Sequence, residues 1–278
     1  MKFVARYLYA PLFFIVFIGL STLLISRDAN SLLLIPLLLI AITVSFVFER
    51  ILPFEKNWNK PRGDSKRDAI HALVNETSNI LAVSLIPIIS MHTQVLNIWP
   101  ADWPLIFQLC LAILIADFGI TLMHYASHKI AVLWRFHAVH HSVQRLYGFN
   151  GLMKHPIHQS IELLAGTSPL LLMGMSVDIG ALLAFAVVIQ LLLQHSNVDM
   201  KLSYAQYVWA VAPGHRHHHL ASKEHGDVNF GLFTMLWDHL LGTFEVTRRQ
   251  PRDGELGIAN QPNYPSNYME QLIKPLTK

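Results

Sequence analysis

Cysteine is almost absent from this sequence. Cys110, which lies inside an apolar run, is the only one among 278 residues. A single cysteine excludes a disulfide framework, a zinc site made of cysteine thiolates and a c-type haem attachment motif. Any metal site in the chain must therefore use nitrogen and oxygen ligands.

Charge is also scarce, since only 14% of the residues are charged while 53% are hydrophobic. Ordinary soluble domains carry about 25% charged residues, so this composition indicates a membrane protein. The net charge of +3 is too small to indicate nucleic acid as a partner, and no nucleic-acid-binding motif is present. The basic residues are scattered or lie between apolar runs, which favours contact with anionic lipid head groups.

Sustained alternation of polar and apolar residues is missing as well, and there is no internal repeat. Without that alternation there is little signal for β-strands. We therefore predict an all-α fold. It should be a polytopic membrane bundle of about four spans plus a hairpin, with a cytosolic, histidine-rich helical cap.

Two uncharged runs of twenty residues, 7–26 and 29–48, open the chain. Each matches the roughly 20 residues that a helix needs to cross the hydrocarbon core of a bilayer. Basic residues ahead of the first run could suggest a signal peptide. The length of the run, the charged Arg27 and Asp28 in place of a small-residue cleavage site, and the second span close behind favour a retained anchor.

The loop at 50–68 has an excess of Lys and Arg, which marks it as cytoplasmic. A third apolar run covers 77–101, and a fourth covers 103–123. With the amino terminus inside, four crossings return the chain to the cytoplasm at His124. We assign residues 1–123 to transmembrane helices.

Residues 124–249 form the predicted metal-binding domain, and they include an apolar hairpin at about 161–198. Its first run, 163–177, has fifteen residues, or roughly 22 Å of helix, which is marginal for a full crossing. Whether the hairpin crosses or is re-entrant stays open. Either both arms of the hairpin cross the membrane or neither does, because otherwise the histidines before and after the hairpin would lie a membrane thickness apart. Residues 250–278, rich in Pro and Asn, are predicted to be a surface tail.

Three histidines stand within five positions just past the fourth apolar run: His137, His140 and His141. Positions i, i+3 and i+4 lie on one helix face, so we predict that the three rings point at a common centre. Imidazole is a common neutral ligand for iron, zinc, copper and nickel. Crowded imidazoles without a metal would repel one another when protonated and would cost desolvation when buried.

Other histidines form groups with the same helical spacing. Fourteen of the sixteen lie at or after position 124, including a second H-x-x-H-H pattern and an H-x-x-x-H pair. His155 and His158 flank a predicted helix start, and ligation stays open for both. The predicted ligands are His124, His128, His137, His140, His141, His195, His215, His218 and His219.

The remaining histidines are predicted not to bind metal. His71, His92 and His239 are isolated and suit a polar surface or a helix end. His217 lies between predicted ligands but faces another direction on a helix, and His225 suits a loop.

Ligating imidazoles need acceptors that orient them, and carboxylates and amides are the usual ones. We predict Asp117, Asp238 and Asn229 in this role, with Asp199 as a further candidate. Asp117 precedes His124 by seven residues, on the same helix face, and an acid late in an apolar span is costly without a partner. For Asp227 we favour a surface charge.

The motifs follow one another in a distinctive order. Between Asp117 and Phe244 the chain carries H-x-x-x-H, L-W-x-F-H-x-x-H-H-S, a His-Pro pair, His-Ser-Asn, H-R-x-H-H, N-F-G and W-D-x-x-x-G-T. This order resembles the fatty acid hydroxylase and sterol desaturase superfamily of integral-membrane di-iron enzymes. The departures are small: Tyr125 stands where the family often has Arg, and Phe230 where it often has Tyr. The first bears on a phosphate or carboxylate contact at that position and not on the metal site.

The resemblance implies an oxygen-dependent enzyme that hydroxylates or desaturates a fatty acyl chain, a sterol or an alkyl lipid. Two iron ions would share roughly eight to ten histidines, with no catalytic residue beyond the ligands, and zinc could replace iron in a purified sample. Hydroxylation is the leading reaction, although desaturation begins with the same hydrogen abstraction. Nothing carboxy-terminal resembles a cytochrome or flavin domain. We therefore expect electrons from a separate cytochrome, ferredoxin or flavoprotein reductase, with the histidines on the cytoplasmic face.

Three other kinds of membrane protein could also contain many histidines. A membrane metal transporter should place its ligands near the middle of spans, whereas these clusters lie at span ends. A membrane protein with bis-histidine haem would not need three histidines in one turn. A lipid-binding relative without oxygenase activity, which keeps a structural zinc, fits the same residues and is separated only by metal analysis and oxygen consumption.

Overall fold

A computed structural model describes residues 2–93, 96–261 and 263–277, and over these ranges the chain is helical with no β-strand beyond isolated bridges. The all-α prediction is confirmed. Five helices are long and apolar enough to cross a membrane. The chain is therefore a multi-pass membrane protein.

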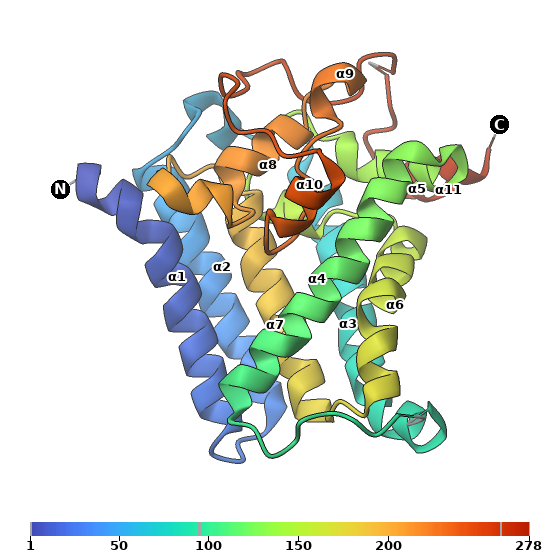
Figure 1. Ribbon diagram of the computed structural model, residues 1–278. Coiled ribbons are helices and arrows are strands. Elements are labelled where there is room, and N and C mark those ends of the chain that lie inside the picture. Colours follow the sequence, from blue (N-terminus) through green and yellow to red (C-terminus); the bar gives the residue numbers. More distant parts are fainter. Residues whose placement is uncertain (1, 94–95, 262, 278) are drawn as a thin grey trace.

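The helices form two layers (Figure 1). Six long helices, α1–α4, α6 and α7, run side by side, and the short helices α5 and α8–α11 lie across one end as a cap. Their bounds are α1 Lys2–Ile25, α2 Leu34–Ile51, α3 Ser65–Thr93, α4 Leu105–Lys129, α5 Ala131–His141, α6 Pro156–Met173, α7 Val177–Gln194, α8 Ala212–His218, α9 Lys223–Gly226, α10 Leu236–Leu241 and α11 Tyr268–Ile273.

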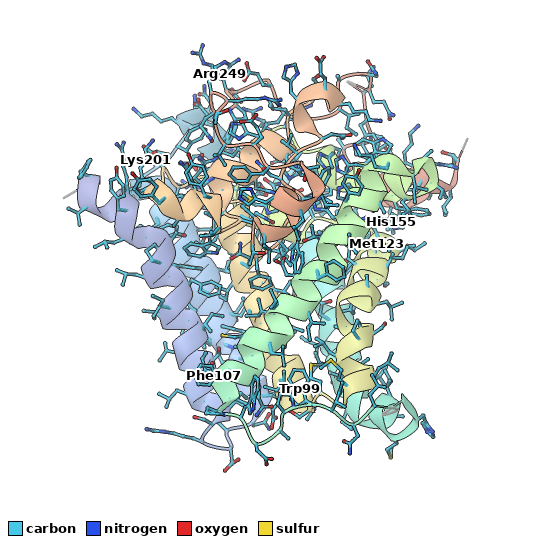
Figure 2. All side chains as sticks on the ribbon, in the orientation of Figure 1. Trp99, Phe107, Met123, His155, Lys201 and Arg249 are labelled. Atoms are coloured by element: carbon cyan, nitrogen blue, oxygen red, sulfur yellow. The ribbon has the colours of Figure 1, made fainter. Side chains whose placement is uncertain are left out.

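Side chains project outward along the long helices (Figure 2). Many of them are large and apolar and are exposed, such as Ile15, Leu39 and Leu114. Helix α7 differs, because its span is mostly buried by the other helices. Helices satisfy their own backbone hydrogen bonds, and an apolar exterior suits contact with lipid chains.

The third long helix starts well before the apolar run at 77–101. It begins at Ser65 and ends at Thr93, and its first turns include buried polar residues such as Asp68. The sequence predicted His71 at a polar surface or a helix end. It lies in the second turn of α3, but it is not at the surface. Its ring is fully buried, with Nδ1 3.0 Å from the Lys154 carbonyl oxygen and Nε2 2.9 Å from Gln271 Oε1.

The hairpin of α6 and α7 extends to the end of the bundle opposite the cap (Figure 1). There the backbone N–H groups of Ile98 and Trp99 donate to the Met173 carbonyl oxygen at 3.1 and 2.9 Å. The end of α6 thus lies beside the connection between α3 and α4. The hairpin therefore reaches as far from the cap as the neighbouring long helices, and its second helix, α7, is among the five that are long and apolar enough to cross a membrane.

Two tight contacts fix the cap on the bundle. Glu49, near the cap end of α2, is buried and accepts hydrogen bonds from the backbone N–H groups of Gly148 at 2.9 Å and Asn197 at 3.0 Å. The carboxy-terminal segment crosses the cap and buries Gln271, whose Oε1 lies 2.9 Å from Nε2 of His71 in α3. Segments far apart in the sequence are thereby held at the same end of the bundle.

Helices α4 and α6 cross at glycines. A Cβ atom at Gly119 would lie 2.1 Å from the Ala165 carbonyl oxygen, and one at Gly166 would lie 2.9 Å from Ile120 Cγ1. Small residues at such a crossing let two membrane helices approach closely. This crossing sets the position of α4, which carries the first two predicted ligands.

We expect Gly119→Ala to destabilise the protein by about 1–3 kcal/mol, because its methyl group can be accommodated only if the helix backbones separate. Unfolding midpoints of the purified protein in detergent measure the effect. Gly19→Ala is the matched control, since nothing lies within 4 Å of a Cβ built at that position in α1. Equal midpoints for the two variants would contradict the account.

Candidate metal centre

All nine histidines predicted as ligands are buried, and they converge where the bundle meets the cap. They come from the cap end of α4, from α5, from the end of α7 and from α8 with the residue after it. In each of two groups the nearest ligand atoms lie within 4.8 Å of one another. The first group is His124, His128, His137, His141 and His218, and the second is His140, His195, His215 and His219.

The predicted common centre for His137, His140 and His141 is wrong, because the structure divides the three between the groups. His137 and His141, one helical turn apart, belong to the five-histidine group, whereas His140 belongs to the four-histidine group. The second H-x-x-H-H pattern is divided in the same way. Each pattern therefore contributes histidines to both groups, because neighbouring positions on a helix are rotated by about 100°.

Three ring nitrogens of the four-histidine group form a triangle. The Nε2 atoms of His195, His215 and His219 lie 3.1 to 3.2 Å apart. A neutral imidazole has one N–H, so three nitrogens cannot all be hydrogen-bonded to one another. Two nitrogens bound to one metal at about 2.1 Å, at about a right angle, are roughly 3.0 Å apart. The residues present fit a metal ion better than they fit one another.

The opposite ring nitrogens are held by the protein. His124 Nδ1 lies 2.8 Å from the Phe230 carbonyl oxygen. His218 Nδ1 lies 2.9 Å from the Val228 carbonyl oxygen. A carbonyl oxygen can only accept, so each Nδ1 carries the proton and each Nε2 has a free lone pair. Both Nε2 atoms are buried without a hydrogen-bond partner among the described residues, as expected for metal-ligating nitrogens.

Asp227 orients a histidine, so the prediction of a surface charge is wrong. Its Oδ1 lies 2.9 Å from His128 Nδ1, and its Oδ2 accepts from Lys129 Nζ at 2.7 Å. Burial alone would raise the pKa of this carboxyl, but the hydrogen bonds from His128 and Lys129 outweigh it and lower the pKa to about 2. The ionised carboxylate thereby turns His128 Nε2 toward the five-histidine group.

Asp117 and Asp238 act on the backbone and not on the imidazoles, contrary to the prediction. Asp117 accepts from the backbone N–H groups of Leu232, Phe233 and Thr234 at 2.7 to 3.1 Å. Asp238 accepts from the N–H of Phe230 at 2.7 Å. The two acids fix the loop whose Phe230 carbonyl holds His124, so their effect on the ligands passes through that loop.

Asn229 and Asp199 are likewise not imidazole partners. Asn229 has a left-handed backbone (φ 56°), and its amide donates to the Gly214 carbonyl oxygen at 2.8 Å, near the start of α8. Asp199 pairs with Arg6 at 2.7 Å, away from the histidines. The sequence shows that these residues are polar, but it does not show which distant segment of the chain provides their hydrogen-bond partners.

Burial keeps the cap histidines neutral. It lowers their pKa values well below the usual value, and neighbouring histidines lower them further. Neutral imidazoles are ready to bind metal without first losing a proton. The residues concerned are His137, His140, His141, His215 and His219.

Ligation was left open for His155 and His158, and the structure distinguishes the two. His155 caps α6, with Nδ1 accepting from the Ile157 N–H at 3.1 Å, and it lies in neither metal group. His158 forms a third group with His137 and Glu162, whose ligand atoms also lie within 4.8 Å of one another. Glu162 was missed from the sequence. Its spacing of four residues from His158, at the edge of an apolar run, is the signal that could have found it.

Other histidines lie outside the groups. His217 is buried, and its Nε2 is 3.4 Å from Gln250 Nε2. His92, His225 and His239 are exposed.

Cavities reach the histidines from both sides. Toward the bilayer, a cavity of about 200 Å³ between α3, α4, α6 and α7 is lined mainly by apolar side chains such as Leu183 and Val187, and we call it the membrane cavity. It shares Lys154, Glu162 and Leu191 with a space of about 10 Å³ that touches both histidine groups.

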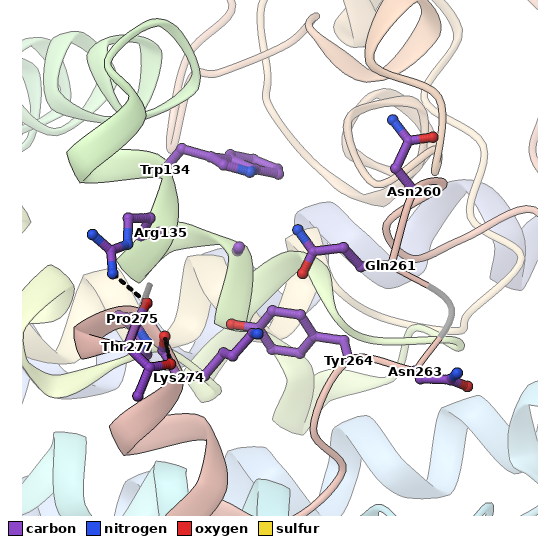
Figure 3. A pocket seen from close by; sticks show the side chains of 10 residues that line it. Trp134, Arg135, Asn260, Gln261, Asn263, Tyr264, Lys274, Pro275 and Thr277 are labelled. Atoms are coloured by element: carbon purple, nitrogen blue, oxygen red, sulfur yellow. Dashed lines mark hydrogen bonds between the residues drawn. The ribbon is translucent and has the colours of Figure 1, made fainter.

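On the cap, two cavities of about 500 and 320 Å³ share Trp134, Asn260 and Gln261, and we call them together the cap groove. Figure 3 shows the larger of them, with Trp134 and Gln261 facing each other across it. The Trp134 ring lies 5.0 Å from the ring of His128 and 5.3 Å from that of His141. One side chain thus borders both the cap groove and the five-histidine group.

Comparisons with known proteins agree with this arrangement. The family model described as "Fatty acid hydroxylase" matches residues 109–243, which contain all nine histidines. The chain is 34% identical over 253 residues to the ornithine lipid hydroxylase OlsE of Rhizobium tropici, covering 85% of this chain and 73% of that protein.

Two more distant relatives are alkylglycerol monooxygenases. Identity is 28% over 198 residues with the Danio rerio protein, covering 64% of this chain and 43% of that protein. It is 27% over 135 residues with the Homo sapiens protein, covering 49% of this chain and 30% of that protein. The chain therefore spans less than half the length of either monooxygenase. No solved structure matches the chain.

We expect Asp227→Ala to weaken metal binding by about 10- to 100-fold, because His128 loses the carboxylate that orients it. Asp227→Asn, which keeps an acceptor oxygen but loses the charge, should have a smaller effect. Metal retained after titration with a chelator measures both. Asp178→Asn, at the exposed start of α7, is the control. Wild-type affinity in Asp227→Ala would show that this contact does not support the site.

Proposed function

Because the chain belongs to the fatty acid hydroxylase family, we propose that it is a membrane-bound di-iron oxygenase that hydroxylates or desaturates a C–H bond of a lipid. Dioxygen is the oxidant, and electrons come from a separate donor. One observation carries the proposal: nine buried histidines form two groups that could each hold a metal ion, next to an apolar cavity between the long helices. The names of the relatives, an ornithine lipid hydroxylase and alkylglycerol monooxygenases, support a lipid substrate.

The five-histidine and four-histidine groups would each hold one iron ion, with His158 and Glu162 close beside the first. Iron bound there would supply oxygen activation: a substrate C–H becomes C–OH, the second oxygen atom leaves as water, and the donor provides two electrons while two protons come from water. The protein's own part is to position the substrate and to fix the imidazoles. The carbonyl of Phe230 and the carboxylate of Asp227 do the latter.

A lipid chain reaches the site from within the bilayer. The membrane cavity is lined by Leu85 of α3 and Leu164 of α6, and both of these side chains are exposed on the apolar exterior. A volume of about 200 Å³ is below the usual range for a pocket that encloses a whole ligand. It therefore suits one chain of a lipid whose remaining parts stay in the membrane.

We assign the cap to the cytoplasmic side. The segment 50–68, which has an excess of Lys and Arg and joins α2 to α3, lies at the cap end of the bundle, and so does the start of α1. Basic loops remain on the cytoplasmic side during insertion. The cap histidines are then within reach of cytoplasmic electron donors.

The cap groove is our candidate for the place where the donor docks. Its lining includes four basic side chains, against the single carboxylate of Asp227. They are Lys129, Arg135, Lys223 and Lys274. An excess of positive charge attracts the acidic surface of a partner. Trp134 lies between this groove and the histidines, and it therefore offers a short path for electrons.

We expect His140→Ala and His141→Ala each to lower the iron content from about two ions per chain to about one, because each substitution removes a ligand from a different group. Both should abolish oxygen-dependent formation of a hydroxylated lipid. Iron analysis and mass spectrometry of lipids from cells with and without each variant measure this. The control is His225→Ala, since His225 is exposed. Wild-type protein that holds zinc and consumes no oxygen after iron loading and reduction would contradict the proposal.

We expect Trp134→Leu to slow reduction of the iron-loaded protein by a chemical or protein donor severalfold, with iron content unchanged. Stopped-flow absorbance measures the rate. Trp103→Leu is the matched control, because Trp103 is exposed just before the start of α4, far along that helix from its histidines. Equal reduction rates for the two variants would remove Trp134 from the electron path.

A further inference from the structure

A buried ion pair lies where the membrane cavity meets the histidines. Lys154 Nζ donates to Glu162 Oε2, and the two side chains are only 10% and 5% exposed. Both residues line the membrane cavity and also the small space beside both histidine groups. A buried ion pair contributes little to stability compared with apolar side chains of similar size, so its presence at this junction calls for another reason.

The pair has spare hydrogen-bonding capacity. An ammonium has three N–H donors, and in the part of the chain that the structure describes, the one hydrogen bond of Lys154 Nζ goes to Glu162. Two donors therefore remain for another partner. They are close to the membrane cavity, whose other walls are mostly apolar.

Among the described residues, the second carboxylate oxygen of Glu162, Oε1, lacks a donor because its neighbour His158 Nδ1 is itself an acceptor. Ser127 Oγ donates its single hydrogen to the Met123 carbonyl oxygen at 2.7 Å, so it must accept from His158 Nε2 at 2.9 Å. The proton of His158 is then on Nε2, and its Nδ1 presents a lone pair. That Nδ1 lies 3.8 Å from Glu162 Oε1, and two acceptors cannot satisfy each other.

We propose that Lys154 and Glu162 together bind a hydroxyl group of the lipid at the head of the membrane cavity. A hydroxyl oxygen accepts from the ammonium, and its hydrogen is donated to Glu162 Oε1. The pair is neutral as a whole, so an uncharged group leaves no buried charge without a partner. A carboxylate in the same place would add an unpaired negative charge.

The proposal rests on the proposed function for the presence of a lipid in the membrane cavity, and it adds the chemical group that this lipid presents. Lys154 and Glu162 are positioning residues. They hold the hydroxyl group of the substrate beside the histidines. The apolar walls of the cavity contact the hydrocarbon chain and do not distinguish one polar group from another.

Binding of long-chain probes to the purified protein in nanodiscs, with its metal in place and no electron donor present, tests the proposal. Hexadecanol, its methyl ether, hexadecane and palmitate serve as competitors of a fluorescent acyl probe. Wild-type protein should prefer hexadecanol to hexadecane by about tenfold, the equivalent of about one or two net hydrogen bonds. The methyl ether, which accepts but cannot donate, should lie between them. Equal binding of hexadecanol and hexadecane by the wild type would overturn the proposal.

Glu162→Gln gives the sharper result. It leaves a buried ammonium without its carboxylate, so palmitate should now bind more tightly than hexadecanol, by about tenfold. The matched control is Glu270→Gln, because Glu270 is exposed on α11. An unchanged order of the four probes in Glu162→Gln would contradict a role in binding.

The double variant Lys154→Met/Glu162→Leu guards against misfolding, since apolar replacements of a buried ion pair are usually tolerated. It should bind hexadecanol and hexadecane equally. A purely structural pair would instead weaken all four probes together. These assays measure binding without an electron donor and therefore without turnover. A failure of the proposed oxygenase function would therefore appear as missing lipid oxidation while the binding preferences remain.

Discussion

The whole arrangement depends on one constraint, the crowding of neutral imidazole nitrogens in a buried space. In the triangle of His195, His215 and His219 the Nε2 atoms approach to 3.1 to 3.2 Å, and hydrogen bonding cannot satisfy all three contacts. Protonation would place like charges side by side in a poorly solvated site. Bound metal ions remove both difficulties, so the fold and the metals are expected to stabilise each other.

Holding these nitrogens together requires fixed backbone around them, and buried acids supply much of it. Asp117 and Asp238 gather the N–H groups of the loop that carries Phe230, and Glu49 ties two other segments at the cap end of α2. Of the acids described, Asp227 touches an imidazole directly. The histidines supply the candidate ligand atoms. Carboxylates, most of which do not contact an imidazole, fix the backbone that positions them.

The sequence predicted the helical bundle and the grouping of nine histidines, because apolar runs and helical spacing are local patterns. It did not predict that His140 separates from His137 and His141, since that depends on which helices face α5 from each side. Nor did it predict the roles of Asp117 and Asp227, or the buried positions of His71 and Glu162. Those depend on contacts between residues far apart in the chain, which no spacing records.

The division of the histidines into two groups is the central claim, and anomalous X-ray scattering from crystals of the iron-loaded protein tests it most directly. Maps recorded at the iron edge should contain two peaks, one among the ligands of the five-histidine group and one among those of the four-histidine group. A single peak shared by all nine histidines, or peaks away from them, would contradict the account.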